Sequence, residues 1–175
     1  MKKIPVCLIV FISLIAGIAY AGIDATYVDV WHYESPQLYL FSRNQYARYD
    51  IIPNKSMGTN TISRGYPAVP FSKIDAAYVD IWHYKTPQLY VFSGDQYARY
   101  DILSNKFMGT NTISRGYPGV PFSKIDAAYV DIWHYKTPQL YVFSGNHYAR
   151  YDILSNKFME TNTILHGYPY VPFIK

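Results

Sequence analysis

The sequence predicts an all-β protein made of three repeated sheets, and three observations support this fold class. The chain from Ile23 to Lys175 is a 51-residue unit written three times; copies two and three agree at 44 of 51 positions, and copies one and two at 40. Short runs of β-branched and aromatic residues alternate with turn residues, whereas no stretch shows a useful 3.6-residue apolar period. A period of about 50 residues is typical of propeller blades, which bury an apolar face only against their neighbours.

The middle copy shows the expected elements of one blade. Residues 76–82 predict a first strand, and residues 88–92 predict a second strand that ends in the hairpin signal Ser93-Gly94-Asp95. Residues 96–102 alternate polar and apolar side chains, as a half-buried third strand does, and residues 107–113 predict a short outer strand. About four antiparallel strands is the content of a propeller blade, so we assign residues 22–175 to one domain with repeats 23–73, 74–124 and 125–175.

Residues 1–21 predict a secretory signal peptide. Lys2 and Lys3 precede an apolar run from Val6 to Ile18, and Ala19-Tyr20-Ala21 supplies the small residues of a cleavage site. The apolar run is shorter than the roughly 18 residues that a membrane span requires, although an uncleaved anchor is the alternative. We therefore expect a secreted protein, extracellular or periplasmic if bacterial, that has no membrane attachment after cleavage.

Composition narrows the possible chemistry of the mature chain. The one cysteine, Cys7, lies in the predicted signal peptide, so the mature protein has no disulfide and no thiolate metal ligand. The formal net charge of +4 falls to +2 once Lys2 and Lys3 are removed, which gives no case for binding nucleic acid. The compositional oddity is the content of 20 tyrosines.

Three motifs in each copy resemble those of the hemopexin-like repeat family. In the middle copy they are Ile-Asp-Ala-Ala-Tyr from Ile74, Leu-Tyr-Val-Phe-Ser-Gly-Asp-Gln-Tyr-Ala-Arg-Tyr-Asp from Leu89, and Gly-Tyr-Pro from Gly116. The resemblance extends over all three copies. Within this family, the chain is similar to secreted bacterial proteins of the photopexin type. It implies a hemopexin-like β-propeller, but such domains normally have four blades and often a disulfide between the first and last. The three blades therefore form an incomplete propeller that stays open, or another chain completes it by oligomerisation.

The third copy differs from the second by three changes toward apolar residues. Leu165, Tyr170 and Ile174 replace Ser114, Gly119 and Ser123. End repeats of stacked arrays usually become more polar, so one hypothesis is that this tail packs on the first blade of the same chain or of another copy, giving a homo-oligomer. The alternative is that they are scattered, exposed apolar residues without a partner.

An axial cation site is the first candidate for ligand binding. Asp24, Asp75 and Asp126 open the predicted inner strands, where converging main-chain carbonyls would suit a hard cation. The hemopexin-like resemblance implies the same site: the main-chain oxygen at these positions would hold a channel Ca²⁺ or Na⁺. It also implies a chloride on the amides of Thr26, Ala77 and Ala128. The alternative is that these residues only start a strand and pack closely at the axis.

Repeated histidines and arginines are further candidates. His32, His83 and His134 follow the three tryptophans and could ligate zinc or haem iron, or they could be surface-turn residues. The resemblance transfers no haem site, because the chain lacks the second propeller and the linker histidine of hemopexin itself. The arginines could form an aromatic and basic ligand surface, or pair with a nearby carboxylate or carbonyl to order the blade; they are Arg48, Arg99 and Arg150.

No enzyme motif accompanies these residues. The sequence contains no Gly-x-Ser-x-Gly, no His-Glu-x-x-His, no Gly-rich phosphate loop and no cysteine nucleophile in the mature chain. We expect a secreted non-catalytic binding protein that recognises an extracellular ligand, haem or iron among the possibilities, or a protein partner. The alternative is a purely structural or protein–protein interaction module, such as a host-directed secreted factor with no small-molecule ligand.

Overall fold

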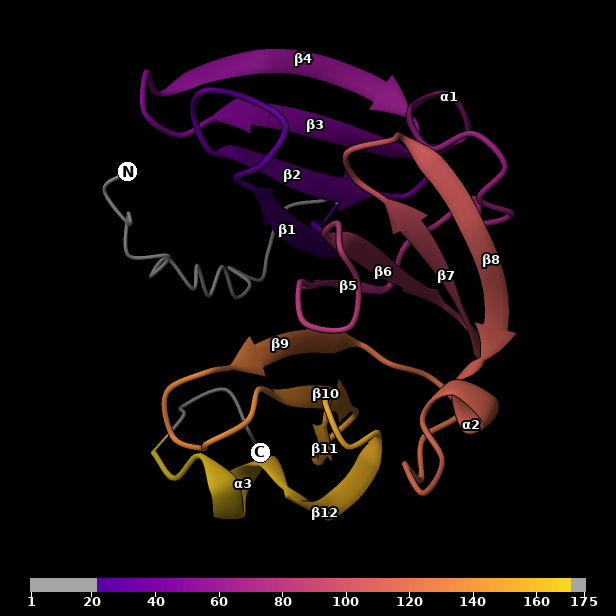
Figure 1. The fold of residues 1–175 in the computed structure, drawn as a ribbon, viewed down its shortest axis with the longest axis vertical. Coiled ribbons are helices and arrows are strands. Elements are labelled where there is room, and N and C mark those ends of the chain that lie inside the picture. Colours follow the sequence, from indigo (N-terminus) through magenta and orange to yellow (C-terminus); the bar gives the residue numbers. More distant parts are fainter. Residues whose placement is uncertain (1–21, 171–175) are drawn as a thin grey trace.

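The computed structural model describes residues 22–170 and contains three four-stranded antiparallel sheets (Figure 1). We call these sheets blade one, blade two and blade three, in chain order. Blade one contains β1 (Ala25–Asp29), β2 (Gln37–Ser42), β3 (Gln45–Asp50) and β4 (Lys55–Thr61). Blade two contains β5 (Ala76–Asp80), β6 (Gln88–Ser93), β7 (Gln96–Asp101) and β8 (Lys106–Thr112). Blade three contains β9 (Ala127–Asp131), β10 (Gln139–Ser144), β11 (His147–Asp152) and β12 (Lys157–Thr163).

This architecture confirms the all-β prediction. Strands that follow one another in sequence pair with one another in every sheet, so each blade is a simple meander. The predicted outer strand is present in each copy and is followed by one short helical turn. These turns are α1 (Ile62–Gly65), α2 (Ile113–Gly116) and α3 (Ile164–Gly167). The predicted signal peptide lies outside the described residues.

The outer strand pair of blade two contains a bulge next to Gly109. The register of β7 with β8 shifts between Arg99 and Tyr100, and Arg99 lies opposite Gly109. Gly109 has a φ of 124°, a left-handed conformation that glycine adopts without steric cost. This bulge bends the outer strand.

The three blades surround one axis (Figure 1). The inner strands are β1, β5 and β9, and β5 lies next to both β1 and β9. The strands β4, β8 and β12 lie on the outside. The described residues therefore form an incomplete propeller of three blades, as the repeat count predicts.

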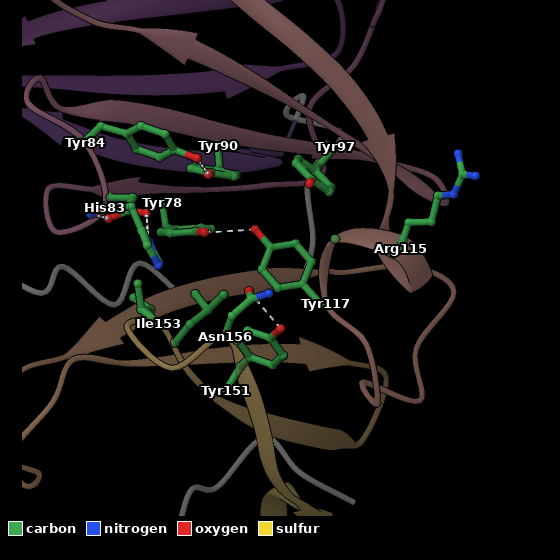
Figure 2. Close-up of a pocket in the computed structure, with 13 residues that line it drawn as sticks. Tyr78, His83, Tyr84, Tyr90, Tyr97, Arg115, Tyr117, Tyr151, Ile153 and Asn156 are labelled. Atoms are coloured by element: carbon green, nitrogen blue, oxygen red, sulfur yellow. Dashed lines mark hydrogen bonds and ion pairs between the residues drawn. The ribbon is translucent and has the colours of Figure 1, made fainter.

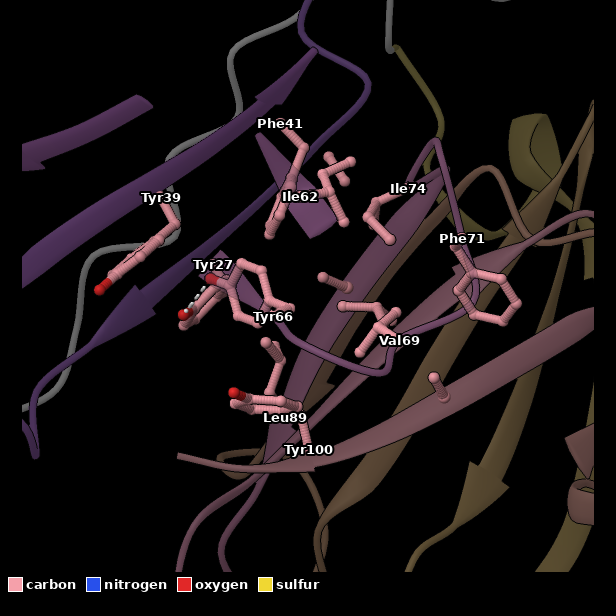
Figure 3. Packing of buried hydrophobic residues seen from close by; sticks show 14 of the residues in the cluster. Tyr27, Tyr39, Phe41, Ile62, Tyr66, Val69, Phe71, Ile74, Leu89 and Tyr100 are labelled. Atoms are coloured by element: carbon pink, nitrogen blue, oxygen red, sulfur yellow. Dashed lines mark hydrogen bonds between the residues drawn. The ribbon is translucent and has the colours of Figure 1, made fainter. Parts of the chain in front are cut away.

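Apolar packing between blades holds this arrangement together. One core cluster joins Phe41 and Ile62 of blade one to Leu89 and Tyr100 of blade two (Figure 3). A second cluster repeats the pattern between blades two and three. Burial of each such side chain contributes about 1.5–3 kcal/mol, so a blade without its neighbour loses most of its core.

The burial of each tryptophan also depends on a neighbouring blade. Trp31 packs against the first cluster and Trp82 against the second, whereas Trp133 of blade three is 62% exposed. The difference arises because, within the described residues, no further sheet follows blade three.

Candidate functional site

Each of the two blade junctions contains a pocket. The first pocket lies between blades one and two and has a volume of about 300 Å³; the second lies between blades two and three and has a volume of about 460 Å³. Volumes of this size fall in the range of small-molecule sites. The two pockets are lined by equivalent residues of successive repeats, so one description serves both.

Most of the second pocket is built by blade two (Figure 2). Tyr78 comes from the inner strand β5, Tyr90 from β6, Tyr97 from β7, and Tyr117 directly follows α2. The opposite wall comes from blade three and includes Leu140, Tyr151, Ile153 and Asn156. The pocket therefore exists only where one blade packs against the next.

Tyrosine hydroxyl groups line the second pocket in hydrogen-bonded pairs. The hydroxyls of Tyr78 and Tyr117 are 2.8 Å apart and buried, and those of Tyr84 and Tyr90 are 3.4 Å apart. Burial raises the pKa of Tyr78 and of Tyr117 well above the usual value, so both phenols stay protonated even at the pH where a free tyrosine ionises. The hydroxyl of Tyr151 donates to Asn156 Oδ1 at 3.0 Å.

Asp80 holds His83 at the edge of the pocket. The buried carboxylate accepts hydrogen bonds from the main-chain N–H groups of Trp82 and His83 at 2.8 and 3.3 Å. The same carboxylate lies 2.8 Å from His83 Nδ1, so Nε2 is the ring nitrogen left for a ligand. Figure 2 shows the His83 ring directed toward Ile153 across the pocket.

The three repeated histidines lie in three separate blades. His32 lines the first pocket and His83 the second, whereas His134 lies on blade three, which no further sheet follows among the described residues. The Nδ1 of His134 is 2.7 Å from Asp131, and that of His32 is 3.7 Å from Asp29. The structure therefore does not bring the three imidazoles together around one metal ion.

Each of the repeated arginines stacks on a tyrosine of its own blade, and Arg48 also lines the first pocket. The guanidinium carbon of Arg99 lies 4.4 Å from the centre of the Tyr84 ring, and the same guanidinium donates to the Tyr84 hydroxyl. Arg48 makes the equivalent contact with Tyr33 at 4.7 Å. Arg150 also bonds a carboxylate, as one alternative predicted, since its Nε donates to Glu160 at 3.0 Å. Arg48 and Arg99 instead contact the hydroxyl and ring of a tyrosine in the loop between the first two strands of their blades.

The carboxylates of the predicted axial cation site already have partners. Lys73 lies 3.3 Å from Asp24 and 3.1 Å from Asp75, and Lys124 lies 2.8 Å from Asp126. Lys73 and Lys124 precede the inner strands β5 and β9, and each also lies near an aspartate of the blade before, Lys73 near Asp24 and Lys124 4.0 Å from Asp75. The second oxygen of Asp75 accepts from the Gly94 N–H at 3.0 Å.

These contacts bear on whether a metal ion fits. Within residues 22–170, no group of three or more His, Cys, Asp or Glu side chains is arranged to hold a metal. The predicted ligands are main-chain oxygens of Asp24, Asp75 and Asp126, so the cation remains a prediction that does not use these carboxylates. The chloride prediction concerns the amides of Thr26, Ala77 and Ala128, which lie on the inner strands β1, β5 and β9.

Sequence reasoning missed the tyrosine pockets. Tyr78 and Tyr117 are 39 residues apart, and nothing in a single copy shows that their hydroxyls meet. A usable signal was present in the sequence: a tyrosine recurs at both positions in all three copies. The opposite wall comes from the following repeat and can be assigned only from the packing of blades.

Known proteins share this fold and these repeats. The crystal structure of the hemopexin fold protein CP4 from cow pea matches 85% of the chain with a TM-score of 0.67 and 29% identity, and the chain covers 70% of it. LS24, a seed albumin from Lathyrus sativus, matches with 30% identity and a TM-score of 0.66 over 85% of the chain and 69% of its own length. The chain belongs to the hemopexin-like repeat family.

Other relatives of this hemopexin-like chain are an albumin, a proteinase and a lectin. Albumin-2 of Lathyrus sativus is 33% identical over 144 residues, which is 74% of the chain and 59% of Albumin-2. Matrix metalloproteinase-21 of Homo sapiens is 27% identical over 164 residues, 85% of the chain but 27% of that protein. A plant lectin with two metal-binding sites from Cicer arietinum matches at 28% identity and a TM-score of 0.67, covering 86% of the chain and 73% of the lectin.

The hemopexin-like chain spans about a quarter of the length of Matrix metalloproteinase-21 and about three-fifths of the length of Albumin-2. No family model matches it. Among the described residues, the structure has no helix that is long and apolar enough to cross a membrane.

Proposed function

We propose that this hemopexin-like protein is a secreted, non-catalytic binding module whose ligand lies in the two pockets between blades. The observation that carries the proposal is that the same pocket is built twice, with equivalent tyrosines, histidine and carboxylate, at both blade junctions. The similarity to seed albumins and to a plant lectin supports a binding role. The signal-like residues 1–21 support export.

The chemistry of the pocket supports binding without catalysis. In the second pocket, the carboxylate of Asp80 already accepts three hydrogen bonds from Trp82 and His83. Such a carboxylate orients the loop and has little remaining capacity to act on a substrate. Burial raises the pKa of the Tyr78 and Tyr117 phenols, so these two remain neutral hydrogen-bonding groups.

A screen with matched variants tests this function. Tyr33 and Tyr84 stand at the mouths of the two pockets with exposed fractions of 41% and 39%, and Tyr135 is 40% exposed on blade three. We expect small molecules detected by ligand-observed NMR to lose binding in the Tyr33→Ala, Tyr84→Ala double variant and to keep it in Tyr135→Ala. Binding that survives the double variant would overturn the location of the site.

Haem is a second candidate, and the histidine geometry favours it. His83 is held through Nδ1 by Asp80, which leaves Nε2 as the nitrogen that would hold haem iron in this aromatic pocket. A hemin titration followed by absorbance tests it with the His32→Ala, His83→Ala double variant, and His134→Ala is the control. A saturable shift that the double variant abolishes and the control keeps supports haem; no shift, or a shift that the double variant leaves unchanged, excludes these pockets as haem sites.

Protein docking is the alternative class, favoured by exposed apolar side chains on blade three. Trp133 is 62% exposed, Leu165 is 59% exposed and Tyr170 is 97% exposed. These residues lie on the last repeat, where a second copy or another extracellular protein would bind. A pull-down that loses its partner with Leu165→Ser and Trp133→Ala, but not with the pocket variants, would favour docking over ligand binding.

A further inference from the structure

We infer that the ligand of the two pockets is a neutral saccharide, bound through tyrosine hydroxyls and rings in two equivalent sites per chain. This inference rests on the proposed binding function and names the class of ligand. It is carried by the chemistry of the pocket walls and by the contacts that their charged groups already make within the protein.

Hydroxyl groups dominate the lining of the second pocket. Six tyrosines face it, and a phenol both donates and accepts a hydrogen bond. The members of the buried pair Tyr78 and Tyr117 bond each other, which uses one donor and leaves lone pairs on both oxygens. A wall of groups that both donate and accept matches a ligand of the same kind, namely one rich in hydroxyl groups.

The charged groups of the lining have partners or point elsewhere. Asp80 is bonded to His83 and to two main-chain N–H groups. Figure 2 shows the Arg115 side chain extending away from the pocket. In the first pocket, the Arg48 guanidinium stacks on the Tyr33 ring and donates to its hydroxyl. The charged side chains of the lining therefore already have partners in the protein or extend outward, which favours a neutral ligand over an anion or a cation.

The aromatic rings suit the other surface of a sugar. A pyranose has an apolar C–H face as well as its hydroxyl edge, and tyrosine combines an apolar ring with a polar tip. The Tyr84 ring is partly exposed at the pocket mouth, and the Tyr97 ring is half-buried within it. Aliphatic lining is limited to Leu140 and Ile153, so a large apolar ligand finds little matching surface.

The second site per chain follows from the repeat. The first pocket presents the pair Tyr27 and Tyr66, with hydroxyls 2.8 Å apart, and Tyr100, which donates to Asn105. On a surface that carries many copies of one sugar, both sites of one chain can bind at the same time. The overall avidity is then about 10²–10⁴ times the affinity of a single site. We therefore expect weak binding of free monosaccharides and strong binding to a dense glycan surface.

Hydroxyl deletion gives a matched test. The Tyr66→Phe, Tyr117→Phe double variant removes one pocket hydroxyl from each site; Tyr168→Phe removes the equivalent hydroxyl of blade three, which bonds Tyr129 at 2.6 Å outside both pockets. The full chain and both variants are applied to a glycan array, and one positive pyranoside is then titrated by calorimetry. We expect two sites per chain, an affinity about tenfold lower in the double variant, and no change in Tyr168→Phe.

Other results overturn the inference. An array with no positive sugar, or a sugar whose binding is the same in all three proteins, excludes the saccharide. If hemin instead binds and depends on His83, the pockets are ligand sites of another class, and the proposed function stands without the saccharide. If neither sugars nor hemin bind and the small-molecule screen is also negative, both proposals fall. Denaturation midpoints of the variants show whether a loss of binding is a loss of folding.

Discussion

The hydroxyl groups of Tyr78 and Tyr117 lie 2.8 Å apart in a buried position, although 39 residues separate them. The pair ties the inner strand β5 to the segment that follows α2. The rings of Tyr117 and Tyr151 also meet edge to face at 5.4 Å across the junction of blades two and three. One tyrosine therefore connects the blade, the pocket and the packing between blades.

Loss of one hydroxyl of this pair should destabilise the fold. Tyr117→Phe leaves the Tyr78 hydroxyl buried without its partner, and we expect a cost of about 1–2 kcal/mol in the free energy of unfolding, measured in urea. The Tyr78→Phe, Tyr117→Phe double variant should cost less than the sum of the two single changes. Tyr168→Phe, at a more exposed position, is the control; an equal cost there would contradict a role for burial.

A methyl group at Gly116 should disturb the pocket. A Cβ added there would lie 2.2 Å from Cε1 of the Tyr97 ring. The ring cannot move freely, because it packs against Phe92 and Tyr117. We expect Gly116→Ala to lower the free energy of unfolding by about 1–3 kcal/mol and to weaken ligand binding. Ser114→Ala, an exposed change in the same turn, should have no effect; an equal loss there would refute the steric explanation.

Stability should fall in acid because of two buried aspartates. Burial alone would raise the pKa of Asp101, but hydrogen bonds from Thr86, the Ser104 N–H and Gln88 outweigh it and lower the pKa to about 2. Asp152 repeats this pattern, with a pKa of about 2. A depressed native pKa adds stability that is present above the unfolded value near 4 and is lost as the pH falls toward 2.

Urea unfolding at pH 7, 4, 3 and 2 measures this loss. The Thr86→Val and Thr137→Val variants remove the hydroxyl groups that donate to Asp101 and Asp152. The decline in stability below pH 4 should then be shallower, because the native pKa values of these aspartates approach their unfolded values. A decline of unchanged steepness in these variants would show that other groups control the acid transition.

Calcium dependence would test the axial cation. If main-chain oxygens of Asp24, Asp75 and Asp126 hold Ca²⁺, the melting temperature should rise with calcium concentration and fall when a chelator is added. Replacing Lys73 and Lys124 by methionine removes two ammonium groups close to these residues and should strengthen the effect. Melting curves that are the same with Ca²⁺, Na⁺ and chelator would show that these oxygens do not bind a stabilising cation.

Self-association should depend on the last repeat. Leu165 and Tyr170 are exposed where the second copy has Ser114 and Gly119. We expect analytical ultracentrifugation to show dimers or larger species at micromolar concentration. The Leu165→Ser, Tyr170→Gly variant restores the residues of the second copy and should be monomeric. A monomer in both proteins would show that these side chains have no partner copy.

Much of the fold could be predicted because it is local and repeated. Residues 88–92 were predicted as a strand and β6 is Gln88–Ser93, since β-branched and aromatic residues bounded by turn residues favour a strand wherever it packs. The candidate site was less predictable. Asp75 was expected to offer its main-chain oxygen, and the structure shows that its carboxylate bonds Lys73 and the Gly94 N–H, contacts set by how the inner strand enters the blade.

By itself, the sequence determined the repeat, the strands and the membership in a family of blades. These properties depend on periodicity and residue type, which are readable along one chain. Only the tertiary structure decided that Tyr78 meets Tyr117, that Asp80 holds His83, and that Leu140 and Ile153 of the next blade close the pocket. The reason is physical: a site between blades exists only after apolar burial has brought two repeats together, and no single repeat contains both of its walls.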